Sequence, residues 1–217
     1  MIHWYTASGV ALIREQPDEY RSICQVGLNR LLDGRRQIDA SNSVARACAL
    51  IPGALDSYDS LLEKTTLSAS QDAEDSPAPI ALFCHGAILY RAGQYEEAKQ
   101  ILERSIVADT RRENHRKTKE YGEADIETIL AKGTPAQWQA TKNWLFLAMS
   151  ESQLGNPDQA RMIYDHIKKY RTRLNNLHSS WIMEISEIDR YLEEARLLLG
   201  VEEEKPEEDA EVETTDK

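Results

Sequence analysis

The sequence has little of what sheet, membrane and secreted proteins need. Only two phenylalanines and seven prolines occur among 217 residues, and no stretch alternates β-branched with polar residues as a half-buried strand does. No apolar run approaches the roughly 20 residues that cross a membrane, and the N-terminal segment lacks the basic start of a signal peptide. These absences favour helices over sheets and predict a cytoplasmic protein without a membrane span.

Cysteine is scarce as well. Cys24, Cys48 and Cys84 are an odd number at wide spacings, and no CxxC pair occurs. This pattern indicates neither a disulfide framework nor a zinc site. Because a free cysteine behaves as a small hydrophobic residue, we expect the three thiols to be buried and structural.

Motifs of catalysis, cofactor binding and metal binding are missing. The five histidines lack the HExxH or paired spacing of metal ligands, and no GxSxG elbow, Gly-rich phosphate loop, HRD or DFG stretch occurs. We therefore expect no enzymatic activity, no cofactor and no metal. His85 is interpreted as a partly buried core residue.

The net charge of −11 is concentrated at the C-terminus. Residues 202–217 contain nine acidic residues and two lysines and so carry −7, which leaves −4 for the rest of the chain. A chain with this balance has no overall positive field to attract nucleic acid. Because the last segment is so polar, we expect residues 201–217 to form a disordered acidic tail.

Helical periodicity is what the sequence does contain. Apolar residues recur at i, i+3 and i+4, and Pro and Gly separate the periodic segments. Ser41 or Asn42 is expected to cap the third helix, and Gly200 to end the last one, whose apolar stripe includes Ile188 and Ala195. The expected helices span approximately 2–14, 17–34, 42–51, 55–67, 80–91, 95–108, 142–154, 158–170 and 181–199.

Two helix–turn–helix segments match each other. Residues 79–112 and 141–174 superpose as units of roughly 34 residues, the period of the tetratricopeptide repeat (TPR). Small residues at matching positions allow helix A to approach helix B closely, and large residues fill the space between units. The matching positions are Leu82, Gly86, Leu89, Gly93, Tyr95, Ala98 and Leu102 in the first unit, and Trp144, Leu147, Ala148, Gly155, Ala160 and Tyr164 in the second.

A charged segment separates the two units. Ala98 and Ala160 are 62 positions apart, so roughly 28 residues exceed one repeat period. This insertion, at about 111–140, begins with the basic stretch 111–119, which is a candidate docking patch for an acidic partner or nucleic acid. The alternative is a solvated helical extension with internal pairs such as Arg116 with Glu120. The absence of interleaved aromatic residues and of any nucleic-acid motif favours the helical extension.

Four stretches together carry a more specific resemblance. WYTASGVALIREQPDEYR (4–21), SVARACALIP (43–52), ALFCHGAILYRAGQYEEAKQILERS (81–105) and NWLFLAMSESQLGNPDQAR (143–161) resemble the TPR segments at the C-termini of large bacterial serine/threonine kinases and WD-repeat proteins. The resemblance covers most of residues 2–199. It departs from the family pattern at Gln16, where the glycine of the repeat is missing. Kinase activity does not follow from it, because the kinase motifs are absent.

The resemblance implies an all-α, TPR-like α-solenoid of antiparallel helix pairs with a C-terminal capping helix. The chain then divides into degenerate N-terminal repeats (1–70), TPR-like repeats with the insertion and the capping helix (71–200), and the tail (201–217).

The implied function is that of a non-catalytic scaffold, which binds a peptide or protein partner on the concave surface formed by the A helices. No short motif in the sequence identifies the partner or indicates an oligomeric state. The alternative is that the same side chains pack on the N-terminal helices or on the helix at 181–199, which then fills the groove. The candidate contact residues are Phe83, Ala87, Tyr90, Arg91, Lys142, Leu145, Met149 and Gln153.

Overall fold

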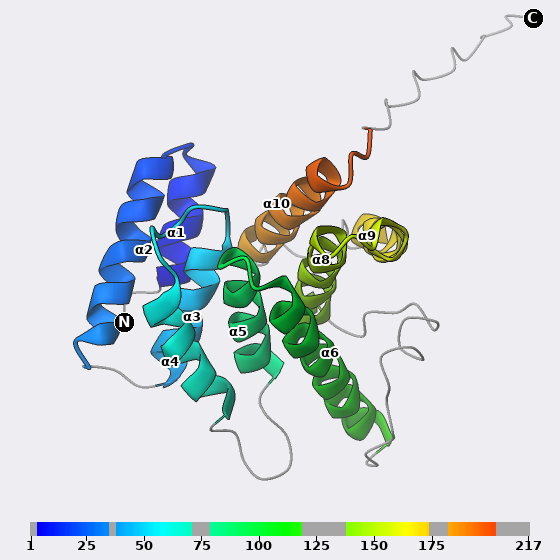
Figure 1. Ribbon diagram of the computed structural model, residues 1–217, viewed down its shortest axis with the longest axis horizontal. Coiled ribbons are helices and arrows are strands. Elements are labelled where there is room, and N and C mark those ends of the chain that lie inside the picture. The colour runs from blue at the N-terminus through cyan, green and yellow to red at the C-terminus, as the bar shows by residue number, and fades with distance from the viewer. Residues whose placement is uncertain (1–3, 35–37, 71–78, 119–137, 174–181, 203–217) are drawn as a thin grey trace, which may run out of the picture.

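The computed structural model describes residues 4–34, 38–70, 79–118, 138–173 and 182–202 (Figure 1). Within these ranges every regular element is a helix and no strand occurs, which confirms the all-α class. The helices are α1 (Trp4–Ile13), α2 (Pro17–Leu32), α3 (Ile38–Ala49), α4 (Asp59–Ser70), α5 (Pro79–Arg91), α6 (Tyr95–Thr118), α8 (Trp138–Gln153), α9 (Pro157–Arg173) and α10 (Ile182–Leu198).

The turns after α5 and α8 have the same hydrogen-bonded structure. Gly93 N donates to Tyr90 O at 3.0 Å and Gln94 N to Leu89 O at 3.0 Å. The equivalent bonds after α8 run from Gly155 N to Ser152 O at 3.1 Å and from Asn156 N to Glu151 O at 2.9 Å. Both glycines are left-handed, with φ of 79° and 82°. This is the αL ending that satisfies the last free carbonyls of a helix.

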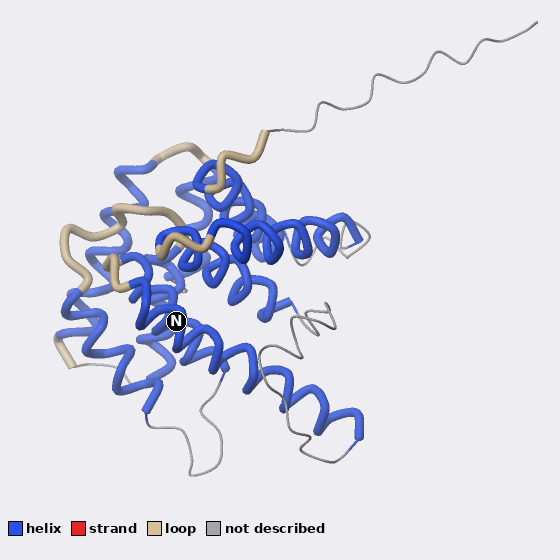
Figure 2. Tube along the Cα trace, turned by 45° about the vertical axis from the view of Figure 1, so that its right-hand side comes forward, coloured by secondary structure: helices blue, strands red, loops and turns tan. Residues whose placement is uncertain are grey.

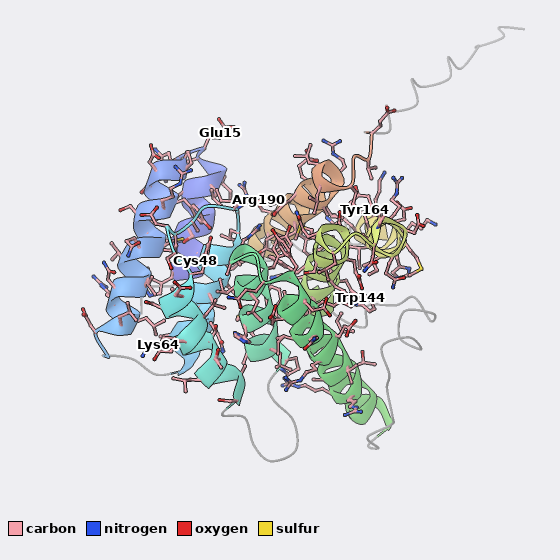
Figure 3. All side chains as sticks on the ribbon, in the orientation of Figure 1. Glu15, Cys48, Lys64, Trp144, Tyr164 and Arg190 are labelled. Carbon is pink, nitrogen blue, oxygen red and sulfur yellow. The ribbon has the colours of Figure 1, made fainter. Side chains whose placement is uncertain are left out.

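The turn between α1 and α2 repeats this pattern without a glycine. Glu15 N donates to Leu12 O at 3.1 Å and Gln16 N to Ala11 O at 3.0 Å, and Glu15 has a φ of 57°. Glu15 lies at one end of the α1–α2 pair (Figure 3). Glu15 therefore occupies the left-handed position that Gly93 and Gly155 occupy in the other two turns, and the departure from the repeat pattern that the sequence places at Gln16 stays a prediction.

Consecutive helices pack together along the chain. α1 contacts α2, α3 contacts α4, α5 contacts α6, and α8 contacts α9. These pairs are joined to one another through contacts of α2 with α3, of α3 and α4 with α5, and of α6 with α8. α10 packs on α8 and also contacts α9 and α1. It lies between the α1–α2 pair and the α8–α9 pair, which are far apart in the sequence (Figure 1). Within the described ranges, Figure 2 shows helices and the loops that join them.

α5 is the central helix and is buried along almost its whole length. Its close approach to α6 depends on Gly86, because a Cβ at that position would lie 2.8 Å from the buried Leu102 Cγ. Ala98 is also fully buried between neighbouring helices, and Ser105 Oγ donates to Pro79 O at 2.8 Å at the other end of α5. The small residues of the first unit thus lie where close packing was predicted.

Four helix boundaries differ from the sequence-based expectation by four residues or more, and one of them is the start of α8, at Trp138 instead of residue 142. α3 begins at Ile38, so Ser41 and Asn42 lie inside it, and Asn42 Oδ1 accepts a hydrogen bond from Ser68 Oγ of α4 at 3.2 Å. α4 begins at Asp59, whose N–H donates to Ser57 Oγ at 3.2 Å, and the preceding residues form a turn. α6 continues to Thr118, so residues 111–118 extend a helix.

Other expectations are met or fall outside the described residues. The three cysteines are buried, and burial raises the pKa of the Cys84 thiol to about 12. His85 is a core residue whose Nδ1 lies 3.0 Å from Thr65 Oγ1. No helix in the described ranges is long and apolar enough to cross a membrane. The acidic tail from residue 203 lies outside the described part of the chain, and the repeat division at residue 70 stays a prediction.

Candidate functional site

The face expected to bind a partner is covered in this structure. The rings of Phe83 on α5 and Phe146 on α8 meet edge to face with centroids 6.0 Å apart, and α10 lies against α8. This is the packed alternative from the sequence, and partner binding at these positions stays a prediction. Phe83, Ala87, Tyr90, Lys142, Leu145 and Met149 are buried, the Arg91 side chain is 2% exposed, and Gln153 is exposed.

The inner face, as we define it, consists of Arg46 of α3, Arg91 of α5, and Lys142 and Phe146 of α8. Three of its four residues are cationic, and all four come from helices that pack together in the centre of the molecule. Their side chains meet α10 through ion pairs and a ring contact. The chemistry of the site is therefore the recognition of one helix by three others.

Glu187 of α10 is the first anchor on the inner face. Its carboxylate forms an ion pair with Lys142, and both side chains are almost completely buried, at 1% and 2% exposure. The same carboxylate accepts hydrogen bonds from Arg46 Nη2 at 3.0 Å, from Tyr5 OH of α1 at 2.7 Å and from Tyr191 OH at 3.1 Å. One carboxylate thus connects α10 to α1, α3 and α8.

The surroundings of Glu187 keep its carboxyl group ionised. Burial by itself raises the pKa, but the charges of Lys142 and Arg46 lower it more, so that the pKa lies below the usual glutamate value. A buried charge is tolerated only when it is paired and hydrogen-bonded. Glu187 meets that condition with two cations and two hydroxyl groups.

Glu194 of α10 is the second anchor. Both terminal nitrogens of Arg91 donate hydrogen bonds to its carboxylate, and the distance from Nη2 to Glu194 Oε2 is 2.7 Å. Arg91 also donates from Nε and Nη2 to the carbonyl oxygen of Ala49 at 3.0 and 2.7 Å. Its guanidinium lies over the ring of Phe146, 5.2 Å from the centroid. Arg91 therefore fixes α10 to α5 and to the end of α3.

An aromatic cluster lies between the two anchors. The ring of Phe146 is 4.8 Å from Tyr191 of α10, 5.4 Å from Tyr90 and 6.0 Å from Phe83, measured between centroids and with edge-to-face orientations. Such pairs contribute beyond the apolar area that they bury. Tyr191 is completely buried, and this burial raises the pKa of its hydroxyl group, which stays a hydrogen-bond donor.

α10 is amphipathic with respect to this face. Glu187, Ile188, Tyr191 and Ala195 are buried, at the i, i+4, i+8 spacing of one helical side. On the other side, Asp189 pairs with Arg171 of α9 at 2.7 Å, and Glu193 pairs with Arg196 of α10 itself at 2.7 Å. Such a pattern is typical of a helix that lies in a groove.

Sequence reasoning missed several residues of this site. It followed the apolar stripe of α10 through Ile188 and Ala195, and both are buried. α10 carries acidic residues on several sides, so the sequence did not distinguish the two inward carboxylates from the outward ones. The available signal was their spacing of seven, with an aromatic residue between them. The missed residues are Arg46, Phe146, Glu187, Tyr191 and Glu194.

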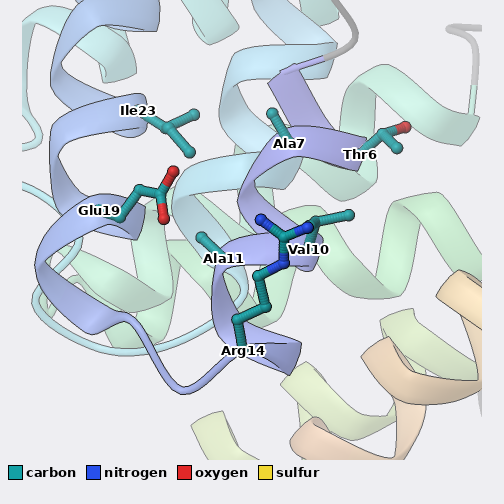
Figure 4. A pocket seen from close by; sticks show the side chains of 7 residues that line it. All are labelled: Thr6, Ala7, Val10, Ala11, Arg14, Glu19 and Ile23. Atoms are coloured by element: carbon teal, nitrogen blue, oxygen red, sulfur yellow. The ribbon is translucent and has the colours of Figure 1, made fainter.

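An open depression between α1 and α2 has a volume of about 440 Å³ (Figure 4). Arg14 and Glu19 supply its charged groups, and the rest of the lining is mostly apolar. It lacks the convergent polar groups of a typical small-molecule site. The lining residues are Thr6, Ala7, Val10, Ala11, Arg14, Glu19 and Ile23.

Two further site hypotheses concern metals and the basic segment. Among the residues that the structure describes, no group of three or more His, Cys, Asp or Glu side chains could hold a metal ion. Arg111 and Arg112 are exposed on α6, and the side chains of residues 113–119 lie outside the description. Binding of an acidic partner or nucleic acid at 111–119 therefore stays a prediction.

No protein-family model matches the chain, and no curated protein matches it closely.

Proposed function

We propose that the chain is a non-catalytic protein-interaction module, a TPR-like α-solenoid of antiparallel helix pairs capped by α10. In this proposal the inner face binds a peptide or protein partner. The identical turns after α5 and α8 support the repeat architecture, as does the related turn at Glu15. The close packing of Gly86 against Leu102 supports it as well.

One observation carries the functional part of the proposal: the inner face already holds an amphipathic helix. α10 pairs two carboxylates with cationic residues and packs one aromatic ring against Phe146, while the side chains on its other side are exposed to solvent. Recognition of a helix through side-chain anchors at i, i+4 and i+7 is a general mode of peptide binding. The residues that converge here hold a helix in place.

Site-specific photo-crosslinking tests the proposal in the full chain. A benzophenone amino acid would replace Gln153, which is exposed at the end of α8 next to Tyr90. A second variant would carry it at Met162, which is 50% exposed on α9 and serves as the control position. We expect a discrete crosslinked partner polypeptide at Gln153 that is absent at Met162.

The outcome also depends on where the crosslink maps. Sequencing of the crosslinked product should place the partner's contact in a helical segment. Equal crosslinking at both positions, or none at Gln153, would count against binding at the inner face.

A further inference from the structure

We infer that α10 is an internal ligand that a partner displaces, and that the partner is an acidic amphipathic helix with two glutamates seven residues apart and an aromatic residue between them. This inference rests on the proposed function and names the class of partner. It follows from the way in which α10 is held, from the charge of the inner face and from the independence of the other helices.

α10 is buried on one side, and its exposed side is joined to the rest of the molecule by the ion pair of Asp189 with Arg171 of α9. Its inward side carries Glu187, Tyr191 and Glu194, while Leu197 on the outward side is 65% exposed. No other described helix contacts the side of α10 that carries Leu197 closely enough to bury it. A helix held in this way leaves along its exposed side without passing through the core.

The remaining helices contact one another without α10. α5 packs on α3, α4, α6 and α8, and α8 packs on α6 and α9. The turn at Gly93 and the contact of Gly86 with Leu102 lie within this group and do not involve α10. The inner face therefore keeps its scaffold when another helix takes the place of α10.

The charge of the inner face selects the replacement. Arg46, Arg91 and Lys142 all form ion pairs with carboxylates of α10, and the side chains of Lys142 and Arg91 are almost completely buried. Removing the partner of a buried charge is strongly destabilising, so an incoming helix must supply carboxylates at both anchors. A neutral amphipathic helix of the same shape would cover these cations without supplying either carboxylate.

The two anchors have a fixed spacing. Glu187 and Glu194 are seven residues apart, which is close to two helical turns or about 10.5 Å along the axis. Tyr191 lies between them and meets Phe146 at 4.8 Å between ring centroids. A partner helix with this Glu–aromatic–Glu order matches all three anchor points at once.

The experiment uses a fluorescent peptide of residues 182–202 as the probe and measures its anisotropy against the full chain. The resident helix would be loosened by Glu194→Gln, a change that leaves every inner-face residue intact. We expect the apparent Kd of the probe to be at least about tenfold lower for Glu194→Gln than for the unmodified chain, because the competing helix is docked for a smaller fraction of the time.

Glu193→Gln is the matched control. It neutralises the adjacent carboxylate of the same helix, which faces Arg196 and solvent instead of Arg91. We expect this variant to bind the probe with the apparent Kd of the unmodified chain. A probe that carries both Glu187→Gln and Glu194→Gln should bind neither chain measurably.

A second measurement uses the unmodified chain and so does not depend on whether the variant folds. The unmodified chain, labelled with ¹⁵N to distinguish it from the probe, would be followed by amide hydrogen exchange at increasing probe concentration. Displacement predicts faster exchange in α10 and unchanged protection in α5 and α8. Unchanged protection of α10 at saturating probe, or equal Kd values for the unmodified chain and Glu194→Gln, would overturn the inference.

The two proposals fail in different ways. A crosslinked partner at Gln153 combined with no effect of the probe on α10 would leave the interaction function standing and remove the displacement. Displacement by the probe without any crosslinked partner would support the acidic-helix groove and count against the proposed partner surface at Gln153.

Discussion

The hydroxyl group of Tyr5 donates a 2.7 Å hydrogen bond to Oε2 of Glu187 and so joins α1 to α10 across 182 positions of the chain. The same oxygen forms the ion pairs with Lys142 and Arg46. The N-terminal and C-terminal helices therefore meet on one buried carboxylate. The stability of the molecule should respond strongly to the loss of this group.

Glu187→Ala is expected to destabilise the chain by about 3–5 kcal/mol, because Lys142 and Arg46 are left without their buried partner. The free energy of unfolding in urea would measure the loss. Glu193→Ala on the exposed side of the same helix should stay within about 0.5 kcal/mol of the unmodified chain. Equal effects of the two substitutions would contradict the central role of Glu187.

Acid should weaken the same network. Burial raises the pKa of Glu187, but Lys142 and Arg46 lower it more, so the pKa in the folded chain lies below that in the unfolded chain. Its ionisation therefore stabilises the fold fully above the unfolded pKa of about 4.3 and progressively less as the pH falls toward the folded pKa.

Glu187→Gln isolates this contribution, because glutamine has no charge to lose. The difference in unfolding free energy between the unmodified chain and the variant should be constant from about pH 6 to pH 5 and should shrink below about pH 4.3. Urea titrations at a series of pH values would measure it. A difference that grew on acidification would show that the carboxyl group is stabilising in its neutral form.

The fold was more predictable than the site because local patterns specify helices, whereas ion pairs across the fold depend on packing. The turn glycine Gly93 and the small residue Gly86 follow from the repeat and lie where they were expected. The boundary of α4 was missed because a turn stabilised by Tyr58, whose hydroxyl group accepts from Ala54 N at 3.2 Å, replaces the first helical residues. No local pattern reveals that Tyr5 and Glu187 are neighbours.

Close packing of α5 on α6 predicts a cost for Gly86→Ala. The added Cβ would lie 2.8 Å from Leu102 Cγ, and Leu102 is fully buried. We expect a net loss of about 1–2 kcal/mol, after the roughly 1 kcal/mol that alanine gains over glycine in helix propensity. Chemical denaturation would measure the loss.

A double-mutant cycle with Leu102→Ala separates the clash from other effects. In the background of Leu102→Ala, the substitution Gly86→Ala should be neutral or stabilising, because the contacted side chain has been removed. The same cost in both backgrounds would mean that the cost does not come from Leu102.

Glu15 and Gly93 occupy the same position in equivalent turns, so exchanging their residue types should have opposite effects. Glu15 is exposed and left-handed, with a φ of 57°, and Glu15→Gly should stabilise the chain by about 0.5–1 kcal/mol. Gly93, with a φ of 79°, has open space around it, so Gly93→Ala should cost about 1–2 kcal/mol through backbone strain alone. Thermal and urea unfolding of both variants would test the signs. Destabilisation by Glu15→Gly would show that the α1–α2 turn does not share the physics of the turns after α5 and α8.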